Sequence, residues 1–118
     1  MFNFEKLIGW QKAIDLADLV YSRTRTFPDS ERFGLTSQMR RAAVSISSNV
    51  AEGSSRASSI DFARFVEIAA GSNFELVSQA IIAKRQGLLS DAGFSGVYAA
   101  AEEESRILSG LRKSLLDG

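Results

Sequence analysis

The chain has 118 residues, of which 45% are hydrophobic and 24% charged, and this size and composition are typical of one folded domain, residues 1–118. It contains no cysteine and no histidine, which excludes disulfides, cysteine-built metal sites and catalytic sites that depend on an imidazole base. Fourteen basic residues balance fourteen acidic ones, and this formal net charge of zero argues against a dedicated nucleic-acid binder.

Apolar residues recur at spacings of three and four through most of the chain, which predicts four helices. The expected bounds are about residues 5–26, 36–52, 59–86 and 91–116. Short polar connections separate these segments, and almost no stretch alternates as a strand does. The pattern predicts an all-α fold, an antiparallel up-down-up-down four-helix bundle.

Turn and capping residues mark where these helices begin and end. Pro28 follows the first helix, since the residue before a proline avoids helical geometry. Thr36 is expected to cap the second helix and Gly53 to end it. Gly87 is expected to end the third helix, and Ser90 to cap the fourth.

The third helix carries more apolar residues than a four-helix monomer needs. Its apolar positions form two stripes: Phe62, Phe65, Ala69 and Leu76, and then Val66, Ala70, Phe74, Val77 and Ile81. Gly71 between them is expected to admit a neighbouring helix closely. The surplus predicts a homo-oligomer, because uncovered apolar surface usually marks an interface.

Both ends of the chain leave a choice open. The N-terminal aromatic and aliphatic residues are Phe2, Phe4, Ile8 and Trp10. They either add to an interface between copies or cover one open end of the bundle. In the fourth helix, Phe94, Val97 and Leu108 are expected to face inward. The acidic run from Glu102 to Glu104 is expected to face mostly outward.

A polar series lies beside the apolar face of the second helix, at Gln38, Arg41, Ser45, Asn49 and Glu52. Asparagine and serine are poor helix-interior residues unless they bond to something specific. Ser72, Glu75 and Gln79 in the third helix offer partners. We interpret the series as a hydrogen-bonded seam that fixes the register of two helices. The alternative is a ligand or ion site built from Arg41, Asn49, Glu52 and Glu75.

Arginines gather on the second helix and its flanking turns. The candidate nucleic-acid contacts among them are Arg32, Arg40, Arg56 and Arg64, because a guanidinium donates bidentately to phosphate. Asp29, Glu31, Glu52 and Asp61 lie between them and nearly cancel their charge. This balance favours a solvated face or salt bridges between subunits over an RNA phosphate track.

Catalytic patterns are scarce, and we expect no enzyme, no cofactor and no metal. Glu52 and Glu75 are the one carboxylate pair that could do acid–base chemistry. Residues 1–10 lack the order of a signal peptide, and no uncharged apolar run is long enough to span a membrane. We therefore expect a cytoplasmic protein without a membrane partner.

Several segments together resemble a known family. Residues 38–53 read QMRRAAVSISSNVAEG, residues 61–65 read DFARF and residues 70–72 read AGS, with Trp10 and Pro28 at matching places. Nearly the whole chain thus resembles the four helix bundle protein family, also called the 23S rRNA-intervening-sequence protein family. The resemblance implies a homopentamer of antiparallel bundles and no catalytic set. Related accessory variability proteins of diversity-generating retroelements are basic pentamers that bind nucleic acid and a reverse transcriptase.

These observations predict a non-catalytic oligomeric scaffold or adaptor, associated with RNA or a nucleic-acid-processing enzyme. The zero net charge of this chain departs from the basic accessory proteins. The alternative is therefore a protein–protein interaction module that binds no nucleic acid. An enzyme using Glu52 and Glu75 is the third hypothesis.

Overall fold

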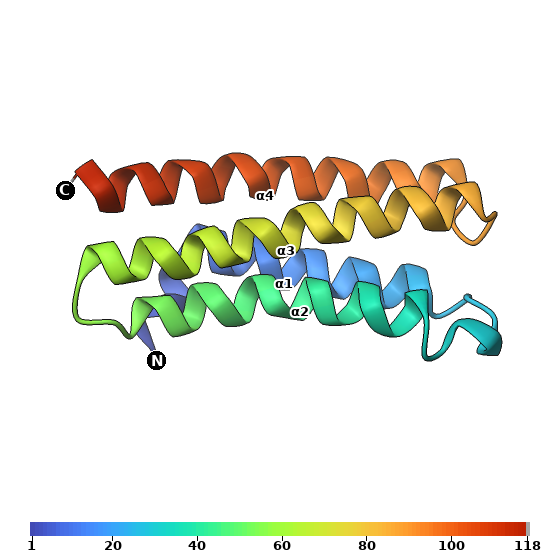
Figure 1. Cartoon of the computed structure of the whole chain (residues 1–118), viewed down its shortest axis with the longest axis horizontal. Helices are drawn as coiled ribbons and strands as arrows, with labels where there is room; N and C mark the ends of the chain where they lie inside the picture. The colour runs from blue at the N-terminus through green and yellow to red at the C-terminus, as the bar shows by residue number, and fades with distance from the viewer. Residues whose placement is uncertain (118) are drawn as a thin grey trace.

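A computed structural model describes residues 1–117 and shows four long helices that run side by side (Figure 1). Their bounds are Ile8–Thr24 for α1, Leu35–Ser54 for α2, Ser59–Arg85 for α3 and Asp91–Asp117 for α4. Two short 3-10 helices are η1, Asn3–Lys6, and η2, Asp29–Glu31. No strand occurs over residues 1–117. The predicted all-α class is confirmed.

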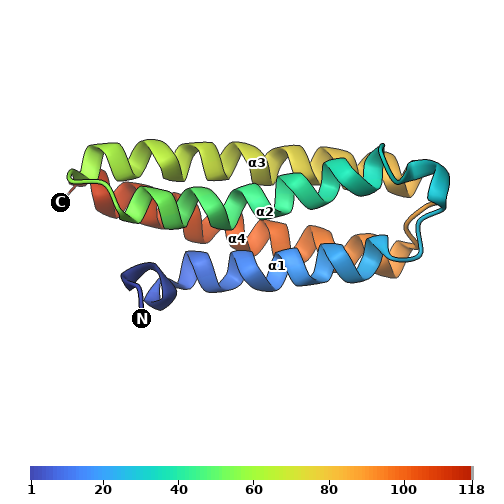
Figure 2. The ribbon, with the colours of Figure 1, turned by 90° about the horizontal axis from the view of Figure 1, so that it is seen from below.

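Each helix runs antiparallel to the next and packs against two others, so that α1 meets α2 and α4, and α3 meets α2 and α4. Figures 1 and 2 together place α1 diagonally across the bundle from α3, and α2 from α4. The rod measures 45 × 22 × 21 Å. This arrangement is the predicted four-helix bundle.

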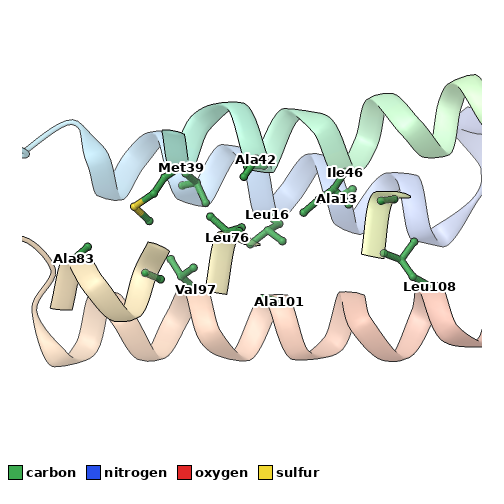
Figure 3. Packing of buried hydrophobic residues seen from close by; sticks show 14 of the residues in the cluster. Ala13, Leu16, Met39, Ala42, Ile46, Leu76, Ala83, Val97, Ala101 and Leu108 are labelled. Atoms are coloured by element: carbon green, nitrogen blue, oxygen red, sulfur yellow. The ribbon is translucent and has the colours of Figure 1, made fainter. Parts of the chain in front are cut away.

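One continuous core fills the space between the four helices (Figure 3). Its largest fully buried side chains include Leu16, Met39, Ile46, Leu76 and Leu108. Full burial of such a side chain stabilises the fold by about 1.5–3 kcal/mol before entropy costs. Alanines on all four helices fill the narrow positions between them and let the backbones approach one another.

The α3 helix has the start and the end that its sequence predicts. Ser58 Oγ accepts a hydrogen bond from the Asp61 N–H at 3.1 Å. At the other end Gly87 has φ +74°, a conformation that glycine adopts without strain. The Leu88 N–H donates to the Ala83 carbonyl at 2.9 Å, which completes a Schellman-type ending.

The start of α2 differs from its prediction, because Thr36 lies inside the helix and does not cap it. Gly34 occupies the capping position without a capping side chain. The carboxylate of Glu31 substitutes for one, since its Oε1 accepts from the Leu35 N–H at 3.1 Å. A cap supplied from four residues upstream has no simple sequence signal.

The predictions for Gly53 and Gly71 are both wrong. Gly53 lies inside α2, and a Cβ there would stand 2.7 Å from the Phe65 Cβ and 2.8 Å from Phe62 Cδ1. It is thus the glycine that lets α3 approach α2. A Cβ on Gly71 would meet nothing within 4 Å, so this position is open space and not a close crossing.

At the N-terminus, residues 3–6 form η1 instead of the first turn of α1. Leu7 is extended, with φ −77° and ψ 128°, and α1 therefore begins at Ile8. None of the helices in residues 1–117 combines the length and apolar character needed to cross a membrane.

Candidate functional site

Part of the predicted polar seam joins α2 to α3. The hydroxyl oxygens of Ser45 and Ser72 are hydrogen bonded at 2.9 Å. Asn49 Nδ2 donates to the Ser45 carbonyl at 2.8 Å and contacts Ser45 Oγ at 3.0 Å. The Ser45–Ser72 bond therefore joins the two helices, while Asn49 bonds to Ser45 within α2.

The other seam residues lie in two separate places. Gln38, Arg41, Glu75 and Gln79 line an open hollow of about 460 Å³ between α2 and α3, where Gln79 Nε2 donates to Glu75 Oε1 at 3.3 Å. Glu52 is near the opposite end of α2 and forms an exposed ion pair with Arg56 at 3.0 Å.

The carboxylate pair that could have supported catalysis does not come together. Gly53, next to Glu52, lies against Phe65. Glu75 is ten residues further along α3, which corresponds to about 15 Å of helix. The alternative site of Arg41, Asn49, Glu52 and Glu75 is therefore not assembled. Within residues 1–117 no group of three or more acidic side chains could hold a metal ion.

The four candidate nucleic-acid arginines each have a partner within the chain. Arg40 Nε donates to Thr24 Oγ1 at 2.9 Å, and its guanidinium lies 4.6 Å from the Tyr21 ring centroid. Arg56 pairs with Glu52 and lies 4.5 Å from the ring centroid of Phe65.

The remaining two arginines are exposed and weakly held. Arg64 pairs with Asp61 at 3.5 Å, and Arg32 lies 5.4 Å from the Phe33 ring centroid. Arg40 lies in the second turn of α2 and Arg56 in the connection after its end, so the fourteen residues from Arg40 to Ser54 separate them by about 21 Å of helix. The arginines therefore form two groups near opposite ends of the bundle, not one continuous track for phosphates.

Large apolar side chains remain exposed on the outside of the bundle. On α3 these are Ile60, Ile68, Phe74, Ile81 and Ile82. Phe74, a member of the second apolar stripe of α3, is 69% exposed. One copy of the bundle buries Ala69 and Leu76 of the first stripe and Val66 of the second, but leaves Phe74 and Ile81 of the second stripe exposed.

The N-terminal aromatic residues cover part of one end. The rings of Phe4 and Trp10 pack edge to face at 5.1 Å, and Phe2 stacks on Phe4 at 5.7 Å. Phe4 and Trp10 are half-buried, but Phe2 and Ile8 remain exposed. The end of the bundle is thus only partly closed by these residues.

Two surface hollows lie on opposite sides of the bundle. The α3–α4 hollow, of about 210 Å³, is lined by Asn73, Phe74, Val77, Tyr98, Ala101, Glu102 and Ser105. The α1–α2 hollow, of about 380 Å³, is lined by Tyr21, Arg40, Arg41, Val44 and Ser45. Both are shallow and open, a shape that suits contact with another protein surface better than enclosure of a small molecule.

Glu104 is a site residue that the prediction of an outward-facing acidic run placed wrongly. Its side chain is 0% exposed, because Val97, Ala101, Glu104 and Leu108 form the inward line of α4. Burial, and secondarily the charge of Glu103, raises the pKa of Glu104 to about 8. The spacing of four, three and four residues was the available signal.

Asn73 is a buried polar residue of α3 that lies close to the level of Glu104 along the bundle. Its Nδ2 donates to the Ala101 carbonyl at 2.8 Å, one helical turn before Glu104. Asn73 Oδ1 and both Glu104 carboxyl oxygens are buried without a hydrogen-bond partner in the described chain. A polar layer therefore interrupts the apolar core at this height.

The chain is similar to known proteins in sequence and in fold. Residues 5–110 match the model of the family described as 23S rRNA-intervening sequence protein. The fold matches a crystal structure from Bacteroides thetaiotaomicron, a protein with unknown function from the S23 ribosomal protein family, with a TM-score of 0.80 and 18% sequence identity. The match covers 90% of this chain and 99% of that one. No curated protein matches this chain.

Proposed function

The chain belongs to the 23S rRNA-intervening sequence protein family, and we propose that it works as a non-catalytic scaffold assembled from several copies of itself. The observation that carries this proposal is the apolar surface that a single copy leaves in water. Phe74, at 69% exposed, and Ile60, at 59%, are the most exposed large apolar residues of α3. Such surface on a small protein favours association.

The geometry of the polar groups supports a role without catalysis. Glu52 and Glu75, the two carboxylates with a candidate acid–base role, lie on separate parts of the surface. The one carboxyl with a strongly raised pKa within residues 1–117, Glu104, is enclosed in the core and out of reach of a substrate. Binding, and not turnover, is therefore the chemistry that this surface supports.

The placement of the arginines favours protein partners over RNA. A phosphate track needs free cations along one face, because each neutralised phosphate contributes to affinity. Arg40, Arg56 and Arg64 are instead engaged with groups of their own chain and are split between two regions. The scaffold thus carries proteins, in a homopentamer as the family resemblance implies. Its lack of cysteine suits the reducing cytoplasm.

Removing one exposed aromatic side chain tests the self-assembly. Phe74→Ser is expected to shift the protein to a smaller species in size-exclusion chromatography. Each interface between copies would lose the free energy gained by burying the Phe74 ring, about 1.5–3 kcal/mol. Phe33→Ser is the matched control, since Phe33 is 88% exposed but precedes α2 in the connection that contains η2. An unchanged elution volume for Phe74→Ser would contradict a role of Phe74 in self-assembly.

A salt titration separates the protein scaffold from an RNA scaffold. We expect no binding of generic RNA even at about 50 mM salt, a low concentration at which phosphate contacts are strong. Tight binding that falls steeply with salt would contradict the protein-only form. If it occurs, Arg32→Glu with Arg64→Glu should weaken it, while Arg40 should be left in place because it bonds to Thr24.

A further inference from the structure

We propose that the α1–α2 hollow of one copy docks against the α3–α4 hollow of the next, with Arg41 beside the partner copy's Glu102. This inference rests on the proposed self-assembly and names the two surfaces that meet. The contact is head-to-tail, so each copy uses one hollow to hold its predecessor and the other to hold its successor.

The charges of the two hollows are complementary. Among the described residues, Glu102 is the one carboxylate that lines the α3–α4 hollow, and no basic side chain lines it. Arg40 and Arg41 line the α1–α2 hollow, and no acidic side chain of residues 1–117 does. Arg41 and Glu102 are both exposed, and neither forms an ion pair within residues 1–117. Opposite charges at such surfaces select the partner and its orientation.

The aromatic side chains fit the same pairing. Phe74 and Tyr98, which are 69% and 40% exposed, stand at the α3–α4 hollow and can offer ring faces to an incoming guanidinium. Phe74 itself can enter the wider α1–α2 hollow next to Val44, which is 41% exposed. The two hollows therefore match in apolar character as well as in charge.

The heights of the hollows along the bundle decide what the contact builds. The Ser45–Ser72 hydrogen bond and the hollow shared by Arg41 and Glu75 place residues 40–45 of α2 level with residues 72–77 of α3. Figure 2 shows that the α1–α2 pair and the α3–α4 pair lie on opposite sides of the bundle. The residues that line the two hollows therefore lie at about the same height on opposite sides. A contact between sites at equal height need not advance along the bundle axis, so it is compatible with a ring, which closes where each contact also rotates one copy relative to the next.

A two-fold contact of the α3–α4 hollow with itself fits less well. It would bring two Glu102 carboxylates into one interface, and the described lining of that hollow supplies no basic group to compensate them. Like charges in a contact cost binding free energy. The head-to-tail arrangement avoids this repulsion.

Charge reversal at the two positions tests the pairing. Arg41→Glu and Glu102→Arg are each expected to raise the dissociation constant for assembly at least about tenfold, because each places like charges together. The double variant Arg41→Glu/Glu102→Arg should recover the wild-type assembly. Lys113→Glu makes the same charge change outside both hollows and should have no effect. Circular dichroism checks that every variant remains helical.

Mixing the two single variants gives an independent readout. The carboxylate introduced by Arg41→Glu can pair with the guanidinium introduced by Glu102→Arg, so the mixture should associate where each variant alone does not, with one contact between like variants left in any ring of five copies. Single variants that assemble like wild type, or a double variant that stays dissociated, would overturn this interface while leaving self-assembly intact. A wild-type protein that is monomeric would instead overturn the proposed function itself.

Discussion

Glu104 lies inside the bundle with neither carboxyl oxygen bonded within the described chain. Burial raises its pKa to about 8, so the carboxyl is protonated at neutral pH. A protonated carboxyl can donate a hydrogen bond, and Asn73 Oδ1 is an acceptor without a donor in residues 1–117, one helical turn away in register. The neutral form makes the polar layer compatible with the core.

The raised pKa makes stability depend on pH in a definite direction. Between about pH 4.5, the value of the unfolded carboxyl, and about pH 8, the folded chain binds a proton that the unfolded chain has lost. The contribution of Glu104 to the free energy of unfolding should therefore be fully present below pH 4.5 and be lost as the pH rises through 8. The slope is at most about 1.4 kcal/mol per pH unit.

Substitution of Glu104 tests this directly. Glu104→Gln keeps the shape of the side chain and cannot ionise. Its free energy of unfolding should therefore not show the decrease between pH 4.5 and 8 that Glu104 causes in wild type. Urea denaturation at several pH values gives the free energy of unfolding of both proteins. The value for the variant minus that for wild type should increase as the pH rises. Asp15→Asn, at an exposed position of α1 outside both hollows, is the control and should leave the pH dependence of the unfolding free energy as in wild type. A flat difference for Glu104→Gln would contradict a buried protonated carboxyl.

At the scale of the helix, the contact between α2 and α3 depends on the absence of a side chain at Gly53. A Cβ there would stand closer to Phe65 and Phe62 than real Cβ atoms do. Neither the Phe65 Cβ nor the α3 backbone can yield cheaply, because the two helices also share the Ser45–Ser72 hydrogen bond. The helices would have to separate.

A matched pair of glycine substitutions measures this contact. Gly53→Ala should lower the free energy of unfolding by about 1–3 kcal/mol through overpacking. Gly71→Ala lies mid-helix in open space and should raise it by about 0.5–1 kcal/mol, because alanine is the better helix former. Thermal or urea unfolding gives both values. Equal effects at the two positions would mean that α2 and α3 are not in close contact at Gly53.

The sequence alone predicted the four helices, their order and the glycine that ends α3, because apolar spacing and turn residues are local signals. It misplaced Gly53, Gly71 and Glu104, because the distance to a neighbouring helix is a tertiary property. Ser45, Asn49 and Ser72 lie together at the seam, while Glu52 and Glu75 do not, since one polar line on a helix spans more length than one site occupies.

At the scale of the whole molecule, the bundle buries one line of α3 and leaves another exposed. The 45 Å rod therefore has a complete core and an incomplete surface. Phe74 and Tyr98 are exposed at the α3–α4 hollow, and Tyr21 and Val44 are exposed at the basic α1–α2 hollow on the opposite side. A molecule with two complementary sides is suited to assemble with copies of itself.

The molar mass of the wild-type protein in solution tests this account most directly. Light scattering at about 10 μM, a concentration at which an interface with micromolar affinity is largely formed, should give several times the 12.8 kDa of one chain. A mass of 12.8 kDa at that concentration would contradict the account, because the exposed apolar surface would then be stable in water without a second copy.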